Sequence, residues 1–158
     1  MSAAGITEMT QYLTFKLADE TFALDVAKVR EILEYPDITK VPQTPDFMRG
    51  VTNLRGSVVP VIDLRLKFGM SATEQTINTC VIVLEVQLED KIIVIGSLAD
   101  SVQEVIEMEP EQIESVPHIG TRINTDFIKG MGKHDGRFVM ILDIDRVFTA
   151  DDLALAQD

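Results

Sequence analysis

Two stretches of this chain repeat each other in the same order, and this repeat limits the possible folds more than any other feature. Each copy amounts to about five short strands, which is too small a unit to bury much apolar surface alone. The economical solution is to close each sheet into a barrel and to pack the two barrels together around a shared core. The matched positions are Val29–Glu34 with Val102–Glu107, Phe47–Gly50 with Phe127–Gly130, Asp63 with Asp143, and Phe68 with Phe148.

The apolar residues alternate with polar ones at the period of β-strands. Leu13, Phe15 and Leu17 share one side of the segment 11–17, and two β-branched runs at 79–88 and 91–98 are joined by two acidic residues. Helical spacing extends over a turn or two at most. The sequence therefore predicts an all-β protein with short helices, in which two five-stranded β-barrels share a hydrophobic core and leave a binding cleft where they meet.

The repeat also suggests domain boundaries. We expect a single domain over 11–158, with subdomain one at about 21–68 and subdomain two at about 79–148. A strand at 11–17 and a C-terminal helix at 149–158 should pack onto these two bodies. The stretch between the subdomains is short and polar and does not have the length of a flexible linker.

Composition excludes several classes of protein. A formal net charge of -12 and a pI near 4.5 argue against nucleic-acid binding, which depends on Lys and Arg. The first residues lack a signal peptide and the apolar runs are too short to span a bilayer, so neither export nor membrane insertion is expected. The single cysteine, Cys80, cannot form an internal disulfide, and this agrees with a reducing cytoplasm.

No convincing catalytic or cofactor motif is present. His118 and His134 are isolated in the sequence, so we expect surface residues and no metal site. The Gly130–Lys133 segment lacks the spacing of a phosphate-binding loop. Asp143 and Asp145 leave open a small metal- or ligand-binding barrel, and an unrecognised hydrolase also stays open. Capping by Asp143 and by its repeat partner Asp63 is the simpler interpretation.

The two copies differ at one hairpin, where Val51–Gly56 stands opposite Met131–Gly136. Arg55 beside Gly56 can project five donors toward the carbonyls or carboxylates of a partner. The alternative is an intramolecular ion pair with Glu31 or Asp63. Val29 and Glu31 can supply an apolar and an acidic contact to the same groove.

Several motifs resemble CheW, the chemotaxis coupling family, over about Gln11 to Phe148. The block RGVTNLRG is the most specific of them because chance matches to eight residues are rare. The resembling segments are Gln11–Phe15, Phe22–Val26, Ile38–Thr39 before Val41–Pro42, Arg49–Gly56, Val59–Arg65, Ala99–Val102 and Ile141–Ile144.

This resemblance implies two barrels of the Src-homology-3 kind without enzymatic activity or cofactor. Such a protein couples methyl-accepting chemotaxis receptors to the histidine kinase CheA in cytoplasmic arrays at the inner face of the membrane, in rings with CheA and further CheW copies. The receptor's hairpin tip would bind beside the first barrel, whereas the resemblance places no residue of the kinase interface. A pathway that controls something other than swimming is the alternative. By motif position, the implied receptor-binding residues are Val29, Glu31, Gly50, Asn53, Arg55 and Gly56.

Overall fold

The computed structural model describes residues 8–115 and 127–148, and strands dominate this part of the chain. None of its helices has the length and apolar character needed to cross a membrane. The prediction of an all-β fold with short helices is confirmed. The strands are β1 (Thr10–Leu17), β2 (Glu20–Asp25), β3 (Val29–Glu34), β4 (Met48–Leu54), β5 (Ser57–Ile62), β6 (Cys80–Leu88), β7 (Lys91–Ala99), β8 (Ser101–Met108), β9 (Ile113–Glu114), β10 (Ile128–His134) and β11 (Arg137–Leu142), and the short helices are η1 (Val26–Lys28), α1 (Leu64–Lys67), η2 (Pro110–Gln112) and α2 (Ile144–Val147).

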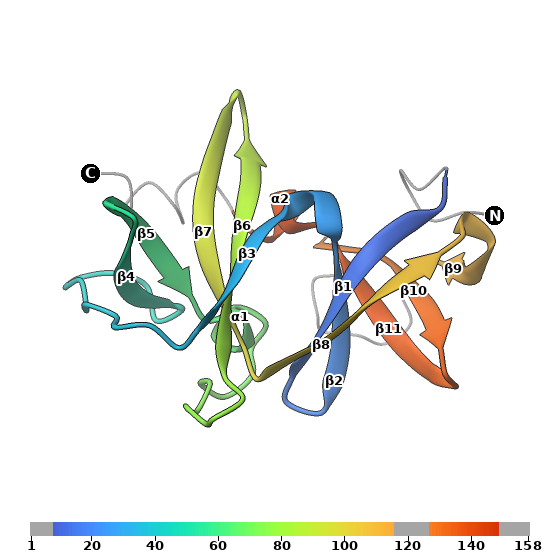
Figure 1. Cartoon of the computed structure of the whole chain (residues 1–158), viewed down its shortest axis with the longest axis horizontal. Coiled ribbons are helices and arrows are strands. Elements are labelled where there is room, and N and C mark those ends of the chain that lie inside the picture. Colours follow the sequence, from blue (N-terminus) through green and yellow to red (C-terminus); the bar gives the residue numbers. More distant parts are fainter. Residues whose placement is uncertain (1–7, 116–126, 149–158) are drawn as a thin grey trace.

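The strands form two curled sheets that lie side by side (Figure 1). The first barrel is a five-stranded sheet in the order β3-β6-β7-β5-β4, and the loop after β3 helps to close it, because Thr39 and Val51 exchange two backbone hydrogen bonds of 2.8 Å. The second barrel has the order β8-β1-β2-β11-β10-β9. Two barrels were predicted and are confirmed, and the short strand β9 adds a sixth strand to the second.

The two repeats exchange their N-terminal hairpins. The hairpin β1–β2 opens the first copy and β6–β7 opens the second, yet each pairs with the later strands of the other copy. Strand β2 lies parallel to β11, and β7 lies parallel to β5. In Figure 1 the blue hairpin β1–β2 accordingly lies between the gold strand β8 and the orange strand β11. Each barrel is therefore built from both halves of the sequence.

This exchange divides the chain differently from the predicted subdomains. Strands β6 and β7, predicted within 79–148, belong to the first barrel, whereas β2, predicted within 21–68, belongs to the second. The predicted strand 11–17 is β1, an internal strand of the second barrel. The predicted helix at 149–158 lies outside the described residues. The repeat could not reveal the exchange, because a hairpin has the same pattern whichever copy it pairs with.

The shared core between the sheets is confirmed. Leu13, Phe15 and Leu17 point from β1 into this core, while Tyr12 on the opposite side of β1 is buried inside the second barrel. Strand β6 is likewise buried on both sides, with Leu84 on the side of the shared core. Both sides of these strands are thus buried, and burial of each large apolar side chain contributes about 1.5–3 kcal/mol.

The exchange predicts that neither half folds alone. Fragments 1–74 and 75–158 each lack the hairpin that completes their barrel, so each should give a spectrum of poorly dispersed amide resonances. Equimolar mixing should restore the dispersed spectrum of the intact chain, as measured by proton–nitrogen correlation NMR. A single fragment that is folded on its own would contradict the exchange.

Candidate functional site

A groove of about 870 Å³ opens on the first barrel between β3, the β4–β5 hairpin and β7. Its rim is charged and its walls and floor are apolar. Val59 and Val83 are buried at the floor, whereas Val58 and Ile92 are each 65% exposed. The residues that line this first-barrel groove are Arg30, Glu31, Leu54, Arg55, Ser57, Val58, Val59, Pro60, Val83, Ile92, Ile93 and Val94.

The β4–β5 hairpin presents Arg55 at the rim of the groove. Arg55 and Gly56 have φ angles of 53° and 87°, which are the positive values that a tight two-residue hairpin turn needs at both central positions. Asn53 supports the turn, since its Oδ1 accepts a hydrogen bond of 2.9 Å from the Gly56 N–H. A non-glycine residue in this conformation costs about 1–2 kcal/mol. Arg55 is thus held at a conformational cost at the hairpin tip.

The Arg55 guanidinium bridges the hairpin to strand β3. Its Nη2 donates to Glu31 Oε2 at 2.8 Å, and the side chains are 78% and 23% exposed, respectively. Of the two predicted intramolecular partners, Glu31 is therefore the one used, while Asp63 pairs with Arg49 at 3.1 Å. An exposed ion pair of this kind contributes no more than about 1 kcal/mol, so it can be exchanged for contacts with a partner at low cost.

Glu31 keeps one oxygen without a partner. Its Oε1 is buried and receives no hydrogen bond from the described residues. A buried acceptor left unsatisfied costs about 1–3 kcal/mol. The Glu31 carboxylate beside the groove therefore has only one of its two oxygens engaged among the described residues.

Two of the six residues implied by resemblance lie away from the groove. Val29 packs against the shared core. Gly50 sits at a β-bulge in β4 with a φ of 145°, where an added Cβ would collide with the carbonyl oxygen of Thr39. The structure thus brings Glu31 and Arg55 together, with Asn53 and Gly56 shaping the turn beside them.

Sequence reasoning missed the exposed apolar residues of the groove. Val58 and Ile92 were assigned to strands without regard to the direction of their side chains. A usable signal did exist, because Phe138, the repeat partner of Val58, is likewise large, apolar and 62% exposed. Apolar residues at the outward position of both hairpins indicate binding surfaces.

Asp143 and Asp145, the predicted alternative ion ligands, are engaged in separate structural contacts. Asp145 accepts from Lys28 Nζ at 2.7 Å and from the Gln87 N–H at 2.8 Å, while Asp143 lies 3.6 Å from Arg146 Nε. The capping role predicted for Asp63 is confirmed, since its Oδ1 accepts from the Arg65 N–H at 3.1 Å. Asp143 makes no such side-chain hydrogen bond.

Burial raises the pKa of two side chains on strands β1 and β6. Burial raises the pKa of the Cys80 thiol, against the opposing effect of a backbone hydrogen bond at Val102. Burial also raises the pKa of the Tyr12 hydroxyl, inside the second barrel.

Comparisons with known proteins agree on one family. The family model of the CheW-like domain matches residues 11–152. A chemotaxis protein CheW of Klebsiella aerogenes is 36% identical over 155 residues, covering 98% of this chain and 91% of that protein. A CheW of Helicobacter pylori is 35% identical, covering 91% and 84%. The crystal structure of the scaffolding protein TtCheW from Thermoanaerobacter tengcongensis superposes with a TM-score of 0.79 at 33% identity, covering 90% of this chain and 94% of that one.

Two glycines of the β4–β5 hairpin should respond differently to alanine. Gly50→Ala should lower the free energy of unfolding by about 3 kcal/mol, because strain at positive φ adds to a collision with backbone. Gly56→Ala should cost about 1 kcal/mol, since a Cβ there meets no atom within 4 Å. Urea unfolding followed by circular dichroism measures both, and equal costs would contradict a structural role for Gly50.

Proposed function

The chain belongs to the CheW-like domain family, and from this premise we propose that it couples methyl-accepting chemotaxis receptors to the histidine kinase CheA. The relatives compared above are chemotaxis proteins, and one solved relative is described as a scaffolding protein. The proposed role is that of a non-enzymatic adaptor, which alters kinase activity through packing and population changes. Its proposed place is the cytoplasm, at the inner face of the membrane through the receptors.

The first-barrel groove carries this proposal. An α-helix is about 10–12 Å across, so a helix resting on the rim would insert the side chains of one face into the groove. Val58 and Ile92 offer apolar contacts at one side, and the exposed Arg55 guanidinium offers donors for the partner's carbonyls or carboxylates. The tip of a receptor's helical hairpin has the shape and chemistry that these contacts require.

The six residues carried over by motif have different proposed roles. Glu31 and Arg55 would contact the receptor directly. Asn53 and Gly56 would hold the turn that presents Arg55. Val29 and Gly50 would act through packing, because they support the strands that carry the groove.

The second proposed partner is the regulatory domain of CheA. We assign it no residues in this chain. Two barrels that present different surfaces from one body would allow receptor and kinase to bind together. Alternation of such units with CheA, or with further copies of this chain, would build rings.

Arg55→Ala should weaken binding to receptors without unfolding the protein. The variant loses an exposed ion pair worth at most about 1 kcal/mol of stability, but also the donors at the groove rim. We expect about tenfold weaker co-sedimentation with receptor-containing membranes, equivalent to about 1.4 kcal/mol. Binding should be measured with and without CheA.

The matched control is Arg137→Ala, which removes an exposed arginine from the equivalent hairpin of the second barrel. It should co-sediment like the unsubstituted chain. Unchanged binding of the Arg55 variant, or equal losses in both variants, would contradict a receptor site at the first-barrel groove.

A further inference from the structure

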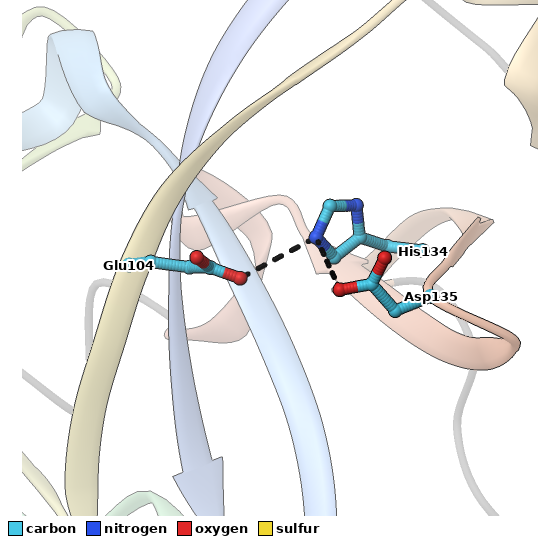
Figure 2. A group of neighbouring side chains, drawn as sticks. All are labelled: Glu104, His134 and Asp135. Atoms are coloured by element: carbon cyan, nitrogen blue, oxygen red, sulfur yellow. Dashed lines mark ion pairs between the residues drawn. The ribbon is translucent and has the colours of Figure 1, made fainter.

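The second barrel carries a counterpart of the Glu31–Arg55 ion pair with different chemistry. In the repeat, Glu104 of β8 corresponds to Glu31, and Asp135 of the β10–β11 turn corresponds to Arg55. His134 lies beside this turn, and Figure 2 shows its ring facing both carboxylates. Where the first barrel pairs a carboxylate with a guanidinium, the second sets two carboxylates around one imidazole.

Two of the spacings in this cluster match those between ligands of one metal ion. His134 Nε2 lies 3.4 Å from Glu104 Oε1 and 3.4 Å from Asp135 Oδ2. Good N–H···O hydrogen bonds are about 2.7–3.2 Å long. Ligands bound at about 2.0–2.1 Å in a tetrahedron around zinc are about 3.3–3.4 Å apart. All three candidate ligand atoms lie within 4.8 Å of one another.

The two carboxylates of the cluster carry negative charge that no lysine or arginine of the described residues offsets. Within residues 8–115 and 127–148, neither Glu104 nor Asp135 forms an ion pair with a lysine or arginine. The backbone that carries Glu104 is well fixed, because Thr14 Oγ1 donates to its carbonyl at 2.8 Å and accepts from its N–H at 3.1 Å. With a neutral imidazole, the cluster carries two negative charges, and their ligand oxygens lie within 4.8 Å of each other.

We propose that Glu104, His134 and Asp135 bind a divalent metal ion of the zinc class. One imidazole nitrogen and two carboxylate oxygens are ligands that zinc accepts, and they leave a fourth position open to solvent. The ion would fasten the β10–β11 turn to strand β8, as Arg55 fastens the β4–β5 turn to β3. Metal replaces arginine as the cation at this place in the repeat.

This site departs from the sequence prediction that His134 is a surface residue without a metal. That prediction rested on the sequence spacing between His134 and other possible ligands. Glu104 is 30 residues earlier and reaches the cluster through the fold. Asp135 is adjacent in sequence, a spacing that no common metal motif uses.

The test is calorimetric titration of zinc chloride into the full-length chain at neutral pH, with any affinity tag removed. We expect saturable binding of one ion per chain. His134→Ala and Glu104→Gln should each weaken binding at least tenfold, since lost ligands cost no less than lost supporting residues. Zinc should also raise the melting temperature of the unsubstituted chain, and raise that of Glu104→Gln by less.

Two control variants locate the ion. His118→Ala removes the other histidine and Cys80→Ser removes the one thiol, and both should bind zinc like the unsubstituted chain. Absence of saturable binding would overturn the proposal. So would full binding by His134→Ala, or loss of binding in either control. The assay contains no receptor or kinase, so its result is independent of the proposed coupling function.

Discussion

The apolar layer between the two sheets holds the rest of the structure in place, because it is built from hairpins that the two repeats have exchanged. Phe15 and Phe22 stack at 6.0 Å between ring centroids, and Phe22 continues the contact to Phe68 at 5.8 Å. These rings come from the second barrel's hairpin and from the segment after the first barrel's α1. Neither barrel can separate from the other without exposing this layer, so the proposed binding surfaces belong to one packed body.

The proposed binding residues lie where the repeats have diverged. The internal strands keep the same pairing and the same bulges in both barrels, near Gly50 and near Gly130. The hairpin tips differ, with Arg55 in one and Asp135 beside His134 in the other. Because tip residues contribute little to the core, they can change without loss of fold. This explains how one duplicated architecture can carry two surfaces with different chemistry.

The sequence predicted the features that depend on local pattern. The alternation of Leu13, Phe15 and Leu17 and the cap at Asp63 were visible because neighbours in sequence cause them. The exchange of hairpins was not visible, since it depends on pairing between distant strands. For the same reason Glu31 and Arg55 could only be suggested as one of two possible pairs. The fold also brings Glu104 of β8 near His134 of β10, although these strands are not paired, and no local pattern indicates this.

The central claim is that a partner helix docks in the first-barrel groove, and hydrogen–deuterium exchange with a receptor hairpin tip tests it most directly. Binding should slow exchange in β3 around Glu31, at the β4–β5 tip around Arg55 and at the start of β7 around Ile92. Exchange in β10 and β11 should stay unchanged. Protection confined to the second barrel, with none at these three segments, would contradict the account.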